Sequence, residues 1–364
     1  MAGSVPGEQH AARRAALVAL LAREGVDALL VAHPPNVRYL TGFTGSAGLL
    51  LVSSQHTTLV TDFRYATQAP QEATGVDVVV ERVNLWDRLG RLLGQVPVDT
   101  LGIESTVLTV RDAERVSALT RSRVVPAPDL VERLRASKTP DEVEAIRAAA
   151  ALAHEALAEI LPGVRAGRRE LDIAAELEAA LRRRGSEWHP FPTIVASGPR
   201  AALPHARSSE REVRSGEFVL IDFGAQVDGY CSDITRTVAV GRADDRQRAI
   251  YGLVEEAQAR ARSGVRAGMP GREADALARD VIAARGFGDA FGHSLGHGLG
   301  LEVHEGPRLS QTSEAPLPGS AVVTVEPGVY LPGWSGVRIE DDVHLGPDGP
   351  CLLSDGRTEL IELT

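Results

Sequence analysis

The feature that most restricts how this chain can fold is an apolar strand that ends in a carboxylate. Residues Phe218 to Asp222 form this strand, Asp228-Gly229 marks a turn, and Ile234 to Val240 follows as a second, β-branched strand. In a hairpin centred on the step between residues 227 and 228, Asp222 and Asp233 would face each other. Like charges that face each other across a ladder are destabilising, so a divalent cation between them is the simplest expectation. A two-residue turn at Asp228-Gly229 would instead shift the register by one and require a bulge to restore this pairing.

A glycine-rich segment, residues 292–305, contains three of the ten histidines: His293, His297 and His304. The spacing of His293 and His297 suits a helical zinc site, but four interspersed glycines make a helix improbable. On an extended backbone these two side chains share a face, and His304 joins them only where a glycine bends the strand. The density of histidines predicts a functional role for at least two of them.

A second pair of carboxylates follows. Val322 to Val325 reads as a strand that continues into Glu326 and a proline, and residues 336–341 place Arg338 and Glu340 on one strand face. Glu326 and Glu340 are symmetric about Gly333, so a returning strand could bring them together. Each carboxylate alone would be a solvated residue at a strand end, but two such pairs with a histidine between them predict a shared site.

The length of 364 residues predicts two domains, and the composition, 43% hydrophobic and 24% charged, is that of a globular protein. Thr139, Pro140 and Glu142 form a capping box with proline at the first helical position, so a new helix is expected there. We therefore expect an α/β domain over residues 1–130, a linker over 131–138 and an α+β domain over 139–364.

Alternating patterns predict the elements of the first domain: a helix over residues 10–24, a strand over 28–32, a loop at His33-Pro34-Pro35-Asn36, strands over 48–52 and 57–60, then helices and strands in alternation to about residue 125. In the second domain we expect helices over 140–160, 169–183, 244–263 and 273–284, with strands and loops after residue 286. The apolar run after Arg13-Arg14 has eight residues and no clear cleavage site, so it is typical of an amphipathic helix and not of a signal peptide.

Charge and cysteine content exclude several classes of protein. The net charge is -10, and the cations, almost all arginine, form no basic block, so a nucleic-acid partner is not expected. No run approaches the roughly 18 apolar residues that span a bilayer, so no membrane partner is expected. Two cysteines in a chain of this size fit a reducing compartment, and we expect a cytoplasmic protein.

Five residues within characteristic motifs resemble a known family. Asp222, Asp233, His297, Glu326 and Glu340, with Asp-Phe-Gly, Gly-His-Gly-Leu-Gly, Val-Glu-Pro-Gly and Arg-Ile-Glu-Asp around them, resemble the pita-bread metallopeptidases. Within that family the chain is similar to the Xaa-Pro aminopeptidase and prolidase branch. This implies a pita-bread α+β catalytic domain in which the five residues bind two divalent metal ions.

The first domain shows the same resemblance. Residues 36–45 (Asn-Val-Arg-Tyr-Leu-Thr-Gly-Phe-Thr-Gly) and 61–65 (Thr-Asp-Phe-Arg-Tyr) are similar to the N-terminal domain of that branch. The resemblance implies an α/β domain of the creatinase/prolidase N-terminal type, a mixed sheet with flanking helices. It also implies a homodimer whose N-terminal domains shape the opening of the partner's active site.

The chemistry of the five side chains agrees with the metal site that the resemblance implies. Four carboxylates and one neutral imidazole carry a charge of -4, which two divalent ions would cancel. Oxygen-rich ligation suits Mn²⁺, although Co²⁺, Zn²⁺ and Fe²⁺ are possible. Two such ions would lower the pKa of a shared water, give a hydroxide nucleophile and polarise a carbonyl, which predicts hydrolysis of an amide.

The resemblance also implies roles for other residues. Glu326 would carry the proton from the attacking water to the leaving nitrogen, and His304 would stabilise the oxygen of the tetrahedral intermediate. His293 is similar to a substrate-side histidine of the family, and His205 to one that binds the carbonyl or carboxylate of the proline residue. Arg338 would hold the ligand carboxylates in place.

Substrate length is left open by these motifs. Arg308 is similar to the arginine with which some prolidases grip a dipeptide's carboxylate, although it could equally be a surface arginine. Residues 39–45 and 62–65 are more like aminopeptidase P, so the first expectation is an Xaa-Pro aminopeptidase that acts on short proline-containing peptides. A prolidase restricted to dipeptides is the alternative. An inactive peptide-binding module ranks below it, as does methionine aminopeptidase, in which the two glutamates are further apart.

Overall fold

The computed structural model describes residues 6–96 and 98–363. The chain divides into two compact units, Met1–Arg135 and Ala136–Thr364. Each unit has its own sheets, helices and buried core. None of the helices in the described ranges combines the length and the apolar character needed to cross a membrane.

The first unit is built on a six-stranded mixed sheet in the order β4-β3-β2-β1-β5-β6. β1 pairs antiparallel with β2 and parallel with β5. In chain order the elements are α1 (Pro6–Glu24), β1 (Ala28–Val31), α2 (Pro34–Thr41), β2 (Gly48–Ser53), β3 (Thr57–Asp62), η1 (Phe63–Tyr65), α3 (Gln68–Glu72), β4 (Asp77–Glu81), α4 (Leu85–Leu93), β5 (Thr100–Ile103), α5 (Val110–Leu119), β6 (Arg123–Pro126) and α6 (Leu130–Arg135). The expected α/β domain with a mixed sheet and flanking helices is confirmed.

Both faces of strand β1 are buried. Ala28 and Leu30 pack with the helices α4 and α5, and the alternate residues Leu29 and Val31 are also inaccessible to solvent. A strand that is covered on both sides reads as a continuous apolar run, and this is why the sequence pattern located it.

The sequence prediction was wrong at the segment that follows β1. His33 to Asn36 was expected to form a loop, but α2 begins at Pro34 and continues to Thr41. Prolines at the first two helical positions are tolerated because those backbone N–H groups have no partner within a helix. The carboxylate of Glu104 accepts hydrogen bonds from the backbone N–H groups of Ala32 and His33 just before the helix. A Pro-Pro pair can therefore begin a helix as well as interrupt one.

The boundary between the units, after Arg135, falls within the segment expected as the linker, residues 131–138, but most of that segment is helical. α6 occupies Leu130–Arg135, most of the segment expected to connect the domains, and belongs to the first unit. Leu130 and Val131 are buried, so apolar packing explains why this stretch is helical.

The second unit contains a four-stranded sheet, β19-β11-β8-β7, a five-stranded sheet, β13-β12-β14-β17-β18, and two small hairpins. Its elements are α7 (Pro140–Ile160), η2 (Leu161–Gly163), α8 (Glu170–Arg183), β7 (Ile194–Ser197), η3 (Gly198–Ala202), β8 (Phe218–Phe223), β9 (Gln226–Val227), β10 (Tyr230–Cys231), β11 (Ile234–Val240), α9 (Asp245–Gly264), α10 (Gly271–Ala284), η4 (Gly288–Ala290), β12 (Gly296–Gly298), β13 (Glu305–Leu309), β14 (Val322–Val325), β15 (Gly328–Leu331), β16 (Ser335–Arg338), β17 (Asp341–Gly346), β18 (Gly349–Leu352) and β19 (Ile361–Leu363). The predicted capping box at Thr139 is present at the start of α7.

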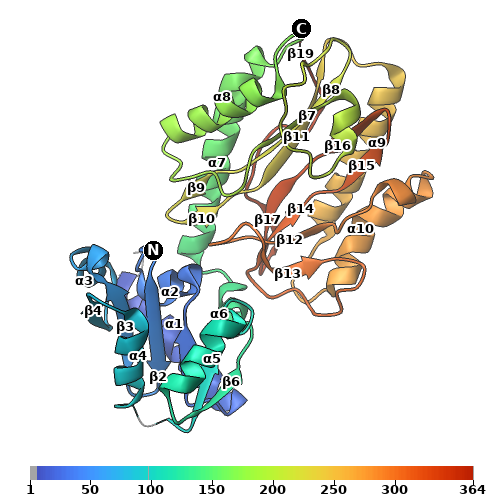
Figure 1. Cartoon of the computed structure of the whole chain (residues 1–364). Coiled ribbons are helices and arrows are strands. Elements are labelled where there is room, and N and C mark those ends of the chain that lie inside the picture. The colour runs from blue at the N-terminus through green and yellow to red at the C-terminus, as the bar shows by residue number, and fades with distance from the viewer. Residues whose placement is uncertain (1–5, 97, 364) are drawn as a thin grey trace. The chain divides into compact units, whose positions relative to one another are not determined.

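The strands of this unit lie between two pairs of helices. Figure 1 shows α7 and α8 on one side of the strands and α9 and α10 on the other. One core joins α7 and α8 to β8 and β11, and a second core joins α9 and α10 to the five-stranded sheet. The α+β fold expected for this domain is confirmed.

The register of the hairpin formed by β8 and β11 corrects one expectation. Asp222 pairs with Thr235, not with Asp233, and Val227 pairs with Tyr230 across a two-residue turn. Asp228 and Gly229 in this turn both have positive φ, as a type I′ turn requires. The turn chemistry therefore set the register, and no bulge restores the direct pairing. Because Thr235 is two residues from Asp233, the two aspartates remain on one face as diagonal neighbours.

The second pair of carboxylates follows the symmetry seen in the sequence. Gly328 pairs with Arg338 in the β15–β16 hairpin, and Val325 pairs with Asp341 between β14 and β17. The same register places Glu326 opposite Glu340, between these two paired segments. A returning strand thus brings the glutamates together.

Candidate metal centre

A cleft of about 950 Å³ lies in the second unit, and the carboxylates of both hairpins line it. All ten residues predicted from the sequence as site residues line this one cleft: His205, Asp222, Asp233, His293, His297, His304, Arg308, Glu326, Arg338 and Glu340. These residues come from strands of both larger sheets, such as β8 and β12, and from the ends of neighbouring strands, so residues that are far apart in the sequence meet there.

The potential ligand atoms form overlapping groups. Asp222, Asp233 and Glu340 make one group, and His297, Glu326 and Glu340 make another, in each of which the atoms lie within 4.8 Å of one another. Glu340 belongs to both groups. These residues could therefore hold divalent cations, and Glu340 could serve either group.

Contacts within β12 and to the neighbouring strand β14 hold His297 in place. Its backbone N–H donates to the hydroxyl of Thr324 on β14, and its Nδ1 donates to the carbonyl of Gly298, 3.0 Å away. This leaves the lone pair of Nε2 directed to the carboxylates of Glu326 and Asp233, at 3.4 and 3.7 Å. A neutral imidazole held in this way is a typical metal ligand.

A bulge at the end of β12 brings a further histidine to the site. The β12–β13 register shifts between His297 and Gly298, and the ring of His304 lies 4.4 Å from that of His297 between centroids. The sequence predicted that His297 and His304 would meet only if a glycine bends the strand. The structure has this bend, at Gly298.

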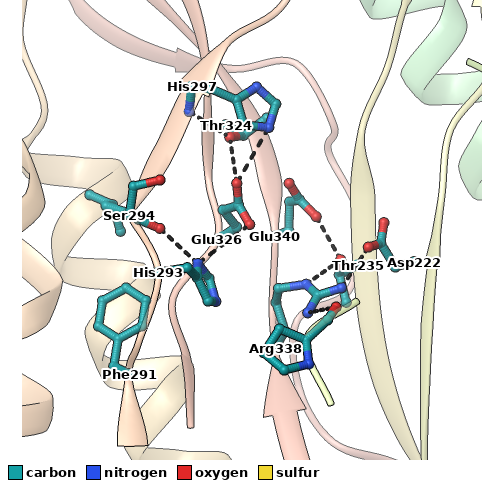
Figure 2. Close-up of polar contacts among 12 residues, drawn as sticks. Asp222, Thr235, Phe291, His293, Ser294, His297, Thr324, Glu326, Arg338 and Glu340 are labelled. Atoms are coloured by element: carbon teal, nitrogen blue, oxygen red, sulfur yellow. Dashed lines mark hydrogen bonds and ion pairs between the residues drawn. The ribbon is translucent and has the colours of Figure 1, made fainter. Parts of the chain in front are cut away.

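Arg338 braces the aspartate side of the site. Its Nη2 donates to Asp222 at 2.5 Å, its Nε to the Thr235 hydroxyl and its Nη1 to the Tyr330 hydroxyl. Thr235 in turn donates to Glu340 at 2.6 Å. Figure 2 shows how the guanidinium and the hydroxyl hold carboxylates from two different hairpins. The sequence analysis identified Arg338 but missed Thr235. Thr235 is two residues after Asp233, so on an extended strand both side chains lie on the same face, and this spacing could have revealed it.

Three of the carboxylates repel one another at close range. Burial, reinforced by the neighbouring acidic groups, raises the pKa of Asp233 and of Glu340 well above the ordinary range. Burial also raises the pKa of Glu326 to about 8. Oδ1 of Asp222 is buried and has no hydrogen-bond partner among the described residues. Oxygen donors that are crowded, desolvated and partly without partners fit divalent cations.

His293 and His297 are both neutral. Burial lowers the pKa of His297 to about 3 and that of His293 to about 4. The Nε2 of His293 is within hydrogen-bond distance of the hydroxyl of Tyr330, and its Nδ1 of the carbonyl of Ser294. His293 thus lies on the cleft wall with both ring nitrogens engaged.

The open side of the cleft is basic. His205, His304 and Arg308 line it and are exposed. Within the part of the chain that the structure describes, none of the three side chains forms a hydrogen bond or an ion pair. Groups of this kind are free to bind a carbonyl or carboxylate of a ligand.

Comparison with known proteins agrees with this geometry. Residues 144–347 match the model of metallopeptidase family M24, and residues 13–137 match the creatinase/prolidase N-terminal domain. The chain belongs to metallopeptidase family M24. As a member of the M24 family it is a hydrolase, and the resemblance seen in its motifs is confirmed.

Similar proteins include members with two names for their activity. A solved structure of an Xaa-Pro dipeptidase from Bacillus anthracis is 40% identical, with a TM-score of 0.95 over 97% of this chain and all of that one. An X-Pro aminopeptidase from Thermotoga maritima MSB8 is 39% identical, with a TM-score of 0.88 over 93% of this chain and 98% of that one. An uncharacterized peptidase of Bacillus subtilis (strain 168), YqhT, is 43% identical over 94% of this chain and 98% of its own length. M24 relatives of this chain thus carry both dipeptidase and aminopeptidase names.

Proposed function

We propose that this M24 peptidase hydrolyses the Xaa-Pro bond at the N-terminus of short proline-containing peptides, with two divalent ions bound by Asp222, Asp233, His297, Glu326 and Glu340. The observation that carries the proposal is the convergence of these ligand atoms on the floor of one cleft with a basic rim. We further propose Mn²⁺ as the preferred ion, because four of the five donors are carboxylates. When bound, such ions supply Lewis acidity and a nucleophilic water at neutral pH.

Glu326 is the group placed to move a proton. Its Oε1 accepts a hydrogen bond from the Thr324 hydroxyl and lies 3.4 Å from Nε2 of His297, so the carboxyl is held within the cleft beside the other ligand atoms. We propose that it takes the proton from the attacking water and gives it to the proline nitrogen as the amide breaks. His304, exposed beside the His297 ring, would donate a hydrogen bond to the carbonyl oxygen as negative charge develops there.

The remaining basic groups would hold the substrate. His205 and Arg308 lie on the open side of the cleft, and we propose that His205 binds the carbonyl or carboxylate of the proline residue. His293 lines the wall beside Glu326, with its Nδ1 3.9 Å from Oε2 of that residue. It would form a neutral part of the pocket for the substrate, and Arg338 would keep the ligand carboxylates in place.

We infer that peptides longer than a dipeptide are accepted. The cleft also includes an apolar wall from α8 and the adjacent loop, with Leu171, Ala174 and Phe191, which leaves space for residues after the proline. The alternative is a prolidase, in which the Arg308 guanidinium would grip the dipeptide's free carboxylate. The unpartnered position of Arg308 in the cleft is the observation that favours this second function.

Substrate length separates the two functions. We expect the Mn²⁺-loaded protein to cleave Ala-Pro-Ala with a kcat/KM at least equal to that for Ala-Pro, and not to cleave Ala-Ala-Ala. A strong preference for Ala-Pro would establish that the protein is a prolidase restricted to dipeptides. Cleavage of neither proline peptide by protein that holds metal would leave only an inactive peptide-binding module.

The quaternary state and location are proposals as well. We propose a cytoplasmic homodimer: Cys231 and Cys351 are both free thiols, as a reducing compartment favours, and the dimer is what the family resemblance implies. Light scattering after size-exclusion chromatography should give twice the chain mass of 38.7 kDa. A monomer mass at micromolar concentration would contradict the dimer.

A further inference from the structure

A buried carboxylate outside the metal centre ties together a loop of the cleft. Glu170 is the first residue of α8, and its side chain is fully buried. We propose that Glu170 is a positioning residue that joins the two ends of the loop carrying His205 and thereby fixes where the proline residue of a substrate is held. The inference rests on the proposed function, in which His205 binds that residue.

The two oxygens of Glu170 serve different ends of this loop. Oε1 accepts hydrogen bonds from the backbone N–H and the hydroxyl of Ser197, both at 2.8 Å. Oε2 accepts from the backbone N–H of Ser209 at 3.1 Å and from its hydroxyl at 2.7 Å. Ser197 ends β7 and Ser209 lies beyond His205, so one carboxylate closes the whole segment.

A carboxylate is suited to this position. Arg200, within the loop, donates from Nε to Oε2 of Glu170 at 3.0 Å and offsets its charge. Glu170 therefore accepts five hydrogen bonds, and only a group with two acceptor oxygens can do so. A glutamine would turn an NH₂ group toward donors at one end of the loop and leave that end without its acceptor.

The middle of the loop is tied to the metal centre. The carbonyl of Pro204 accepts a hydrogen bond from Nη1 of Arg338 at 3.3 Å, and Arg338 also binds Asp222. The imidazole of His205 itself has no partner within the described ranges, so its position depends on how its backbone is held. Glu170 at the ends and Arg338 at the centre both hold that backbone, together with the Ser208 hydroxyl, which is hydrogen-bonded to Thr193 and Val195.

Glu170→Gln tests the proposal against a matched control, Glu142→Gln. Glu142 is also a buried glutamate in the first turn of a helix, α7, and accepts hydrogen bonds from the Thr139 N–H and the Tyr230 hydroxyl, but it does not line the cleft. Both variants lose a buried charge, and we expect both to lower the melting temperature. Only Glu170→Gln should change substrate binding.

The kinetic readout is the KM for Ala-Pro-Ala and the inhibition constant of free proline. We expect Glu170→Gln to raise both about tenfold, the effect of one lost hydrogen bond, with kcat and metal content close to wild type. In a His205→Ala background the same change should alter KM less than twofold, because the group it positions is gone. The proposal is overturned if the effects of Glu170→Gln and His205→Ala on KM multiply in the double variant. It is also overturned if His205→Ala alone has the wild-type KM.

Trypsin provides a readout that needs no substrate turnover. Arg200 and Arg207 lie within the loop, so its release should expose their peptide bonds. We expect Glu170→Gln to be cut there at least several times faster than both wild type and Glu142→Gln. Unchanged cleavage would overturn the proposal even if no Xaa-Pro peptide proved to be a substrate. If Glu170→Gln fails to fold, Ser209→Ala removes one of the five hydrogen bonds and should raise KM about threefold.

Discussion

At the scale of single residues, the brace formed by Arg338 connects both pairs of carboxylates. Its guanidinium contacts Asp222 directly, and through Thr235 it is linked to Glu340. The planar fork of arginine makes these contacts simultaneously, whereas a lysine ammonium at this position would reach one of them. The identity of this residue, and not only its charge, should matter.

We therefore predict that Arg338→Lys lowers kcat/KM by about 10- to 100-fold, the usual range for a residue that orients metal ligands. The loss should be accompanied by weaker Mn²⁺ binding, measured by isothermal titration calorimetry. Arg246, whose guanidinium lies over the Trp334 ring away from the cleft, gives a matched control as Arg246→Lys. Wild-type activity and affinity in Arg338→Lys would contradict this account.

The carboxylates also predict the pH dependence of metal binding. The pKa of Glu326 is raised to about 8 without metal, so below that pH the group carries a proton that a cation must displace. Affinity should thus fall as the pH falls below about 8, by about tenfold per pH unit for each proton displaced, and proton release should be seen by calorimetry in buffers of different ionisation enthalpy. Equal affinity at pH 6 and pH 8 would refute this prediction.

At the scale of elements, strand β12 depends on glycines that leave room for neighbouring backbone. A Cβ at Gly296 would lie 2.0 Å from the carbonyl oxygen of Thr324, the residue that orients His297. A Cβ at Gly292, in the same glycine-rich segment, would meet nothing within 4 Å. The two positions look alike in the sequence and differ in their surroundings.

We predict that Gly296→Ala destabilises the protein by about 3 kcal/mol or more and reduces metal content, because backbone cannot yield as a flexible side chain does. Gly292→Ala should change neither by a measurable amount. Thermal unfolding and metal analysis of the two variants test this prediction. If both variants lose the same stability and the same metal content, the spacing of β12 and β14 does not determine the site.

The elements also show what the sequence could predict. Asp222 and Asp233 were located correctly as a pair, but their direct pairing was wrong because the Asp228-Gly229 turn fixes the register around itself. Glu326 and Glu340 were correctly predicted to lie opposite each other, because the β15–β16 hairpin turns around Gly333 without a bulge. The helix at Pro34 was missed because Glu104, far along the chain, supports its start. Nothing in the sequence marked Glu170, because its partners are brought to it only by the fold.

At the scale of the whole molecule, the metal centre is a concentration of buried negative charge within an acidic protein. The groups whose pKa is raised, such as Asp233 and Glu340, bind more protons in the folded than in the unfolded state between about pH 4.5 and their folded pKa. The contribution of these groups to folding is present at low pH and is lost as the pH rises through that window. Metal ions should offset the loss.

We accordingly predict that chelation lowers the melting temperature, by roughly 5–10 °C for one site at a hundredfold excess of ligand over its Kd, and that the difference widens from pH 6 to pH 8. Differential scanning calorimetry with Mn²⁺ or with EDTA measures this. The melting temperature of Asp233→Asn should respond less to Mn²⁺. The prediction is contradicted if EDTA leaves the melting temperature at pH 8 the same as that with Mn²⁺.

The central claim is that the carboxylates of the two hairpins and His297 hold two catalytic metal ions, and counting those ions tests it most directly. Elemental analysis of Mn²⁺-saturated protein, with the rate of Ala-Pro-Ala hydrolysis measured on the same samples, should give two ions per chain in the wild type. In Asp233→Asn and Glu326→Gln it should give fewer than two ions with turnover abolished. Either variant with two bound ions and full turnover would contradict the account.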